Sequence, residues 1–329
     1  MAMATRAAMG RPASATWRTS TGKARRKASH VVASSKAADL QASFGIDGSV
    51  SVEEGKGGLT KVVLRHNCGS SAEVYLFGGC VTSWKQASGD EVLYVRPDAK
   101  FDGSKPISGG VPHCFPQFGP GDMQQHGFAR NLEWTISSTS ADPNPDDPDP
   151  SVELTLEDSE YTRAMWDYPF KLVYEVTLHN EKLMTDMRVV NTGAEPFTFT
   201  AALHTYLEVA GVRNASVKGL CGLKYLDKVS DPENPKEGTE TREKLQFQGP
   251  VDSVYLDAPE QVELDVGTGA AVVIQSRGWK DVVVWSPWTA MACYESFVCV
   301  ENAVFGQPVT VSPGDSWRGQ QEFSVVDLE

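Results

Sequence analysis

The chain has 329 residues, and its 30 Lys and Arg stand against 43 Asp and Glu, a formal net charge of −13 at pH 7. This acidic balance argues against a nucleic-acid or anionic-membrane partner, because like charges repel. No stretch approaches the ~18 apolar residues that a membrane span needs. The six cysteines are scattered without CxxC pairs, which is not the pattern of a structural zinc site or a disulfide scaffold.

The first 38 residues differ in composition from the rest. They contain eight Lys and Arg and no acid before Asp39, and Ala, Ser and Thr fill most of the remainder. This is typical of an organellar transit peptide, and the abundance of Ala and Ser favours the chloroplast stroma over the mitochondrion. A basic, anion-binding arm is the alternative. Without this segment 22 basic residues face 43 acids, a net charge of −21. We therefore predict a transit peptide over residues 1–38 and one mature domain over 39–329.

Short segments with two-residue alternation of apolar and polar side chains recur along the mature chain. In chain order they are Leu59–Leu64, Glu73–Trp84, Val152–Leu156, Phe170–Leu178, Leu183–Val189, Phe197–Leu203, Val262–Val266, Ala270–Gln275, Val282–Trp285 and Phe297–Glu301. The polar turn at Asn180–Lys182 predicts a hairpin. Only Glu160–Asp167 resembles a helix, which Pro169 would end. Many short strands separated by turns predict an all-β sandwich, a single large antiparallel domain.

The sequence lacks the common cofactor motifs. Gly267-Thr268-Gly269 lies between two predicted strands and lacks the third glycine of a dinucleotide fingerprint, and no GxxxxGK[ST] loop is present. His113 and His126 are thirteen residues apart without an HxH pair. We therefore expect neither cofactor nor bound metal. Cys114 follows His113 directly, so the two would face opposite sides of a strand, and we predict a buried structural thiol.

The densest polar region comprises residues 109–119 and 124–131. Gly and Pro here impose unusual backbone angles, while Gln, His and Arg supply hydrogen-bonding groups. Such side chains on a rigid loop predict a ligand-binding surface, with an ordinary hairpin linker as the alternative.

Two further residues interrupt apolar strands. His204 lies opposite the apolar face formed by Phe197, Phe199, Ala201 and Leu203, on a polar and aromatic strip with Tyr206. Glu301 closes the apolar run Phe297–Val300. On its own, each has a plain explanation: a hydrogen-bonded core histidine, and a glutamate that reaches solvent at a strand end.

At these residues the sequence resembles the hexose-6-phosphate mutarotases (glucose-6-phosphate 1-epimerases) of the galactose-mutarotase-like superfamily. The resemblance covers roughly residues 45 to 326 and is carried by Gly78–Trp84 (GGCVTSW), Ile107–Pro112 (ISGGVP), Gln125–Arg130 (QHGFAR), Leu203–Tyr206 (LHTY) and Val300–Ala303 (VENA). QHGFAR together with FVCVEN is specific, whereas either alone would be weak.

The resemblance implies a β-supersandwich in which His204 is the general acid and Glu301 the general base. It also implies that the sugar contacts Gln125, His126, Arg130, Asp252, Arg96 and Ser108. Much of the family has Arg where this chain has Ser108, and that Arg is implicated in phosphate recognition. Arg130 would then meet the phosphate, with Arg96 and Lys105 the nearest other cations in sequence.

The implied reaction is interconversion of the α and β anomers of a hexose 6-phosphate without cofactor. The base takes the C1 hydroxyl proton and the acid protonates the ring oxygen, from opposite sides of the sugar. Rotation about C1–C2 and ring closure complete the exchange. Two alternatives remain: an aldose 1-epimerase for free hexoses, and a non-catalytic carbohydrate-binding or sensor protein. In each case we expect a monomer whose partner is a small sugar or sugar phosphate.

Overall fold

The computed structural model describes residues 36–141 and 149–328. Most of the predicted transit peptide lies outside this part, and helix α1 (Lys36–Phe44) spans the predicted boundary at residue 38. This helix was not predicted. Of its side chains only Ala37 is buried, so no apolar stripe reveals it in the sequence.

The largest sheet has nine strands in the order β15-β12-β17-β18-β21-β9-β8-β7-β6, all paired antiparallel. The strands are β6 (Thr135–Ser140), β7 (Ser151–Glu157), β8 (Phe170–His179), β9 (Lys182–Asn191), β12 (Ser216–Lys218), β15 (Lys244–Gln246), β17 (Gln261–Asp265), β18 (Ala270–Arg277) and β21 (Ser316–Asp327). The predicted hairpin is confirmed, because β8 and β9 pair from Phe170 opposite Asn191 to His179 opposite Lys182.

A second sheet of eight strands has the order β14-β13-β16-β19-β20-β10-β5, with β11 also paired to β20. The strands are β5 (His113–Cys114), β10 (Phe197–Leu203), β11 (Tyr206–Glu208), β13 (Lys224–Asp227), β14 (Lys236–Thr239), β16 (Val251–Tyr255), β19 (Asp281–Ser286) and β20 (Phe297–Val311). Strand β20 runs well beyond the predicted Phe297–Glu301. Pairing with β10 along its second half extends it past the apolar run that the sequence displays.

A third sheet has four strands, and short helical turns complete the structure. The strands are β1 (Val50–Glu54), β2 (Thr60–Arg65), β3 (Ser71–Tyr75) and β4 (Cys80–Lys85); the turns are η1 (Lys56–Gly58), η2 (Ala129–Asn131), α2 (Glu160–Arg163), η3 (Trp288–Ala290) and η4 (Tyr294–Ser296). The single segment predicted over Glu73–Trp84 divides into β3 and β4 because Gly78 and Gly79 turn the chain with φ of 80° and 56°. Helix α2 is shorter than predicted and is capped by Ser159.

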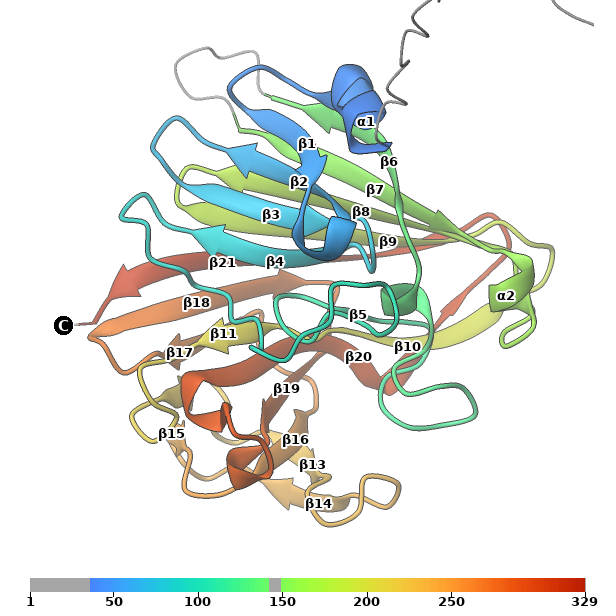
Figure 1. The fold of residues 1–329 in the computed structure, drawn as a ribbon. Helices are drawn as coiled ribbons and strands as arrows, with labels where there is room; N and C mark the ends of the chain where they lie inside the picture. Colours follow the sequence, from blue (N-terminus) through green and yellow to red (C-terminus); the bar gives the residue numbers. More distant parts are fainter. Residues whose placement is uncertain (1–35, 142–148, 329) are drawn as a thin grey trace, which may run out of the picture. The chain divides into compact units, whose positions relative to one another are not determined.

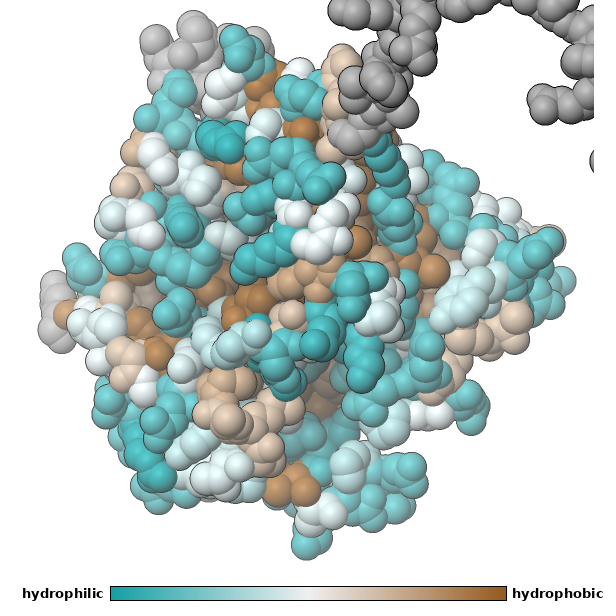
Figure 2. All heavy atoms as spheres, in the orientation of Figure 1, coloured by the Kyte–Doolittle hydropathy of each residue, from teal (hydrophilic) through white to brown (hydrophobic). Residues whose placement is uncertain are grey.

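Figure 1 shows how the strands of the three sheets are arranged. The sheets pack through aromatic side chains. Phe199 of β10 contacts Trp317 of β21 with ring centroids 5.6 Å apart, which joins the two large sheets. Trp84 of β4 contacts Phe323 of β21 at 6.2 Å. The view in Figure 2 is mainly hydrophilic, as expected when strand faces bury their apolar side chains. The all-β antiparallel sandwich is therefore confirmed.

Neither α1 nor α2 has the length and apolar composition that a membrane-spanning helix requires.

Candidate active site

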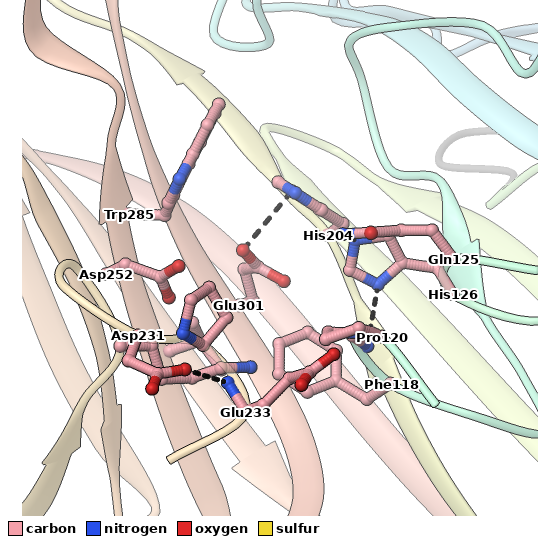
Figure 3. Close-up of a pocket in the computed structure, with 14 residues that line it drawn as sticks. Phe118, Pro120, Gln125, His126, His204, Asp231, Glu233, Asp252, Trp285 and Glu301 are labelled. Carbon is pink, nitrogen blue, oxygen red and sulfur yellow. Dashed lines mark hydrogen bonds and ion pairs between the residues drawn. The ribbon is translucent and has the colours of Figure 1, made fainter. Parts of the chain in front are cut away.

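Strand pairing brings His204 and Glu301 together. Leu203, at the end of β10, pairs with Asn302, and Tyr206, at the start of β11, pairs with Cys299. His204 thus lies in the short break between β10 and β11, and the same register sets it opposite Glu301. Its Nδ1 is 3.2 Å from Oε1 of Glu301 (Figure 3).

This pair lies in the wall of a cavity of about 390 Å³. The lining side chains come mainly from the eight-stranded sheet and from two loops beside it, residues 118–126 and 228–233. The lining residues are Phe118, Gly119, Pro120, Gln125, His126, His204, Lys228, Asp231, Pro232, Glu233, Asp252, Val283, Trp285 and Glu301. Five of the eight predicted site residues are among them: Gln125, His126, His204, Asp252 and Glu301.

Burial controls the protonation of the central pair. Glu301 is 1 % exposed and His204 is 8 % exposed. Burial, together with the nearby Asp252 carboxylate, raises the pKa of Glu301 well above its usual value. Burial also lowers the pKa of His204 to about 3. Both shifts favour the uncharged side chains, so at neutral pH the pair holds one transferable proton in total.

The pair is not satisfied by hydrogen bonds. Although Nδ1 of His204 is close to Oε1 of Glu301, the two are not aligned for a hydrogen bond, and among the described residues neither Nδ1 of His204 nor Oε2 of Glu301 has a partner. Unpaired buried polar atoms are costly, and they cluster at sites that a ligand completes. The short separation also leaves no room for a sugar between them. The two groups therefore lie side by side in one wall of the cavity, a different placement from the predicted one on opposite sides of the sugar.

Aromatic contacts fix the plane of the His204 ring. It stacks on Tyr206 at 4.8 Å with an interplanar angle of 13°, and Trp285 meets its edge at 5.6 Å. The predicted strip shared by His204 and Tyr206 is therefore present. Stacked and edge-on rings leave an imidazole little freedom to rotate, so its nitrogens keep a fixed direction.

The QHGFAR loop has a strained backbone at His126. This residue has a positive φ of 65°, which is uncommon outside glycine. Its Nδ1 accepts a hydrogen bond from the Gly119 N–H at 3.1 Å, so the ring proton of the neutral form is on Nε2. Burial lowers the pKa of His126 to about 2, which keeps it neutral. Next to it, Gly127 has a φ of 68°, and a Cβ there would lie 2.2 Å from the Phe115 carbonyl oxygen, so the loop requires glycine.

The other predicted residues are placed differently. Arg130 does not line the cavity, but its Nη2 donates to the Gln125 carbonyl at 2.9 Å, and its charge contributes to the lowered pKa of His204. Arg96 is held by both carboxylate oxygens of Asp98, at 2.9 and 2.7 Å. Neither Arg96 nor Ser108 lines the cavity. The backbone N–H of Arg96 donates to the Ser108 carbonyl at 3.0 Å, and the Arg96 charge acts on Tyr206, which stacks on His204, so the two lie near the central pair but outside the cavity lining.

Lys228 was missed at the sequence level. It directly follows β13, where a lysine is ordinarily solvated, yet it is only 4 % exposed and lines the cavity. Its backbone N–H donates to the Asp252 carbonyl at 2.8 Å, which continues the pairing of β13 with β16. No sequence pattern singles it out, because its burial depends on rings contributed by distant segments.

Cys299 lies close to the central pair. One ligand atom from each of Cys299, His204 and Glu301 falls within 4.8 Å of the others, a spacing that a metal ion could use. Metal binding would require the thiolate. Burial raises the pKa of Cys299 well above its usual value and so opposes that form. The predicted structural role of the neighbouring Cys114 agrees with its complete burial.

Known proteins are similar to this chain in both sequence and fold. The family model described as aldose 1-epimerase matches residues 60–324. A candidate glucose-6-phosphate 1-epimerase of Cenchrus ciliaris is 38 % identical over 287 residues, covering 82 % of this chain and 85 % of the relative. A protein of the same description from Escherichia coli K12 is 34 % identical, covering 70 % and 79 %.

One solved structure shows how far the fold agrees. The crystal structure of a candidate mutarotase from Salmonella typhimurium superposes with a TM-score of 0.76 at 28 % identity, covering 86 % of this chain and 96 % of that one. The chain belongs to the aldose 1-epimerase family.

Proposed function

We propose that this protein interconverts the α and β anomers of a hexose 6-phosphate, with glucose 6-phosphate as the first candidate. The observation that carries the proposal is the close approach of the His204 Nδ1 and Glu301 Oε1 atoms, 3.2 Å apart, in the wall of an open cavity. A pure binding site has no need for such a buried acid and base. The names of the relatives from Cenchrus ciliaris and Escherichia coli support the phosphorylated substrate.

The mechanism uses one proton donor and one proton acceptor. Transfer of the pair's one transferable proton from Glu301 to His204 gives the reactive form, in which Glu301, as carboxylate, takes the proton of the C1 hydroxyl, while His204, as imidazolium, gives a proton to the ring oxygen O5. The C1–O5 bond breaks, C1 becomes an aldehyde, and rotation about C1–C2 presents its other face. Reversal of both transfers closes the ring. Because O1 and O5 are both bonded to C1, two groups on one wall can serve both atoms.

The neighbouring polar groups would hold the sugar hydroxyls. His126 has its Nε2–H beside the side-chain amide of Gln125, at 3.4 Å, and Asp252 offers a half-buried carboxylate. Gln125 lines the same wall, and its backbone carbonyl is held by Arg130. A sugar fixed in this way presents C1 to the pair in one orientation, which lowers the entropic part of the barrier.

Anomer-exchange NMR on glucose, galactose and their 6-phosphates tests the proposal. We expect enzyme-dependent exchange that is fastest for a 6-phosphate. Faster exchange of free hexoses would favour the alternative aldose 1-epimerase. Saturable binding of these sugars without exchange would show a sensor or binding protein and refute the enzyme.

We also propose that the protein is imported into the chloroplast stroma and acts as a monomer. The basic, acid-free composition of residues 1–38 supports import. Terminal sequencing of protein from the organism should find a start between about residues 30 and 45, and an intact Met1 or Ala2 would contradict import. Sedimentation of the purified protein tests the monomer.

A further inference from the structure

Lys228 has an unusual environment for a lysine. Its ammonium lies over the rings of Phe118 and Phe305, 4.9 and 5.1 Å from their centroids. A Cβ on Gly119 would come within 3.1 Å of its Nζ, so the ammonium lies against the loop that also orients His126. The side chain is 4 % exposed and lines the cavity that contains Glu301 and His204.

The Lys228 ammonium has no direct hydrogen-bond partner. Within the described ranges, its Nζ makes no hydrogen bond or close ion pair, although its charge acts on the Asp252 and Glu301 carboxyl groups, which line the same cavity. Two aromatic faces offset part of the cost of burying the charge. They leave its three N–H donors free, and those donors can only be satisfied by what enters the cavity.

Other cations are less suited to meet a substrate anion. Arg96 is already held by Asp98, and Lys105 is exposed and does not line the cavity. Arg130 donates to the Gln125 carbonyl. Among the lining residues Lys228 is the one that carries a fixed positive charge. The carboxylates of Asp231 and Glu233 also line the cavity, but both residues are exposed, so water and salt screen their repulsion.

We propose that Lys228 determines the specificity for a phosphorylated sugar, its ammonium binding the phosphate group of the substrate. This proposal rests on the proposed function and identifies the side chain that binds the phosphate group of the substrate. The aromatic clamp holds the stem, so little side-chain freedom is lost when the phosphate binds. The contact is a charge-assisted hydrogen bond.

A competing role for Lys228 is to counter the negative charge of Asp252 and Glu301. In that case its removal would slow phosphorylated and free sugars equally and would shift the pH profile of exchange for both. If Lys228 instead binds the phosphate, its removal slows exchange of the phosphorylated sugar only. The pH profile of exchange for free glucose then stays unchanged.

The test compares Lys228→Met with Lys224→Met, an exposed lysine on β13 whose removal changes the net charge equally. Methionine keeps the apolar stem between the two rings. For Lys228→Met we expect kcat/KM for glucose 6-phosphate to fall about 10- to 150-fold, the range that 1.5–3 kcal/mol represents. The value for free glucose should change less than threefold, and Lys224→Met should match the wild type. Lys228→Arg should recover most of the loss. An equal loss on both sugars, or none, overturns the proposal.

Measuring the binding of a substrate analogue that cannot react tests this inference separately from the proposed function. 1,5-Anhydroglucitol 6-phosphate has no anomeric hydroxyl and cannot be turned over, and its affinity can be measured by calorimetry beside that of 1,5-anhydroglucitol. We expect the wild type to prefer the phosphate ester and Lys228→Met to lose that preference. Absence of exchange with any sugar would refute the enzyme but leave this comparison valid. Should Lys228→Met unfold, Lys228→Gln provides the same comparison. A preference that persists without the ammonium refutes the role of Lys228.

Discussion

The two large sheets bury side chains of different kinds, apolar in one and partly ionisable in the other. In β8 of the nine-stranded sheet, the alternate side chains of Phe170, Leu172 and Val176 are almost completely buried in the apolar core. The eight-stranded sheet shares that core through one face, but around its other face it buries Lys228 and Glu301 beside the cavity. Burying apolar area stabilises the fold, whereas burying ionisable groups costs stability and is retained where it serves chemistry.

Two histidines show how one strand face differs from the other. His113 pairs with Leu203, next to His204 in the sequence, yet its ring packs in the core between Trp134 and Tyr174 at 4.8 and 4.3 Å. Its Nε2 lies 3.2 Å from the Gly79 carbonyl oxygen, to which it donates. His204 instead faces the cavity. The same residue type on neighbouring strands is thus structural in one place and a candidate acid in the other.

The largest expected effect is on the cavity side. Glu301→Gln keeps the shape of the side chain but removes the base, so exchange should fall by about 10²–10⁴-fold. His204→Asn should cause a similar loss. Circular dichroism and thermal unfolding should show an intact fold, because burial already favours the uncharged form of Glu301 and the glutamine adds no charge. The matched control is Glu237→Gln, an exposed residue on β14 of the same sheet. More than a tenth of the activity remaining in Glu301→Gln would refute the assignment.

The converse experiment weakens the nine-stranded sheet. Leu172 is fully buried on β8 between Leu156 and Val189 of the neighbouring strands. Leu172→Ala should lower the free energy of unfolding by about 2–5 kcal/mol. Exchange per folded molecule, measured well below the melting temperature, should not change. A large change in the exchange rate without loss of stability would contradict the comparison in which the nine-stranded sheet provides stability and the eight-stranded sheet carries the site.

The pH dependence of stability sharpens the comparison of the two histidines. Burial lowers the pKa of His113 from 6.5 to about 4. Below pH 6.5 the unfolded chain binds this proton and the folded chain does not, so stability falls with pH until about pH 4. At pH 5 the loss is about 2 kcal/mol. Urea denaturation at pH 7.5 and 5.0 measures it, and His113→Gln should reduce the difference by about that amount. Equal losses in both proteins would refute the role of His113.

The smallest expected effect is that of metal removal. The cluster of Cys299, His204 and Glu301 has the spacing of a metal site, but burial favours the protonated thiol. Exhaustive chelation should therefore leave the exchange rate unchanged. A large loss that added zinc restores would show that this cluster holds a catalytic ion.

The sequence by itself determined the fold class and most of the site. Two-residue alternation located the strands of the β8–β9 hairpin, because a strand that buries one face must alternate. The motifs around Gln125, His204 and Glu301 predicted residues that meet in one cavity. Local pattern could not reveal α1, which buries almost nothing, or the full length of β20, which its pairing with β10 determines.

Only the tertiary structure decided how the charges are distributed. Arg96 is near the glycine-rich loop in sequence, but Asp98 holds it away from the cavity lining. Lys228 has no motif, yet Phe118 and Phe305, more than 180 residues apart in the chain, enclose its ammonium in the cavity that His204 and Glu301 also line. Strand alternation is a local property and can be read from neighbouring letters. The surroundings of a charge are set by distant segments that meet only when the sheets pack.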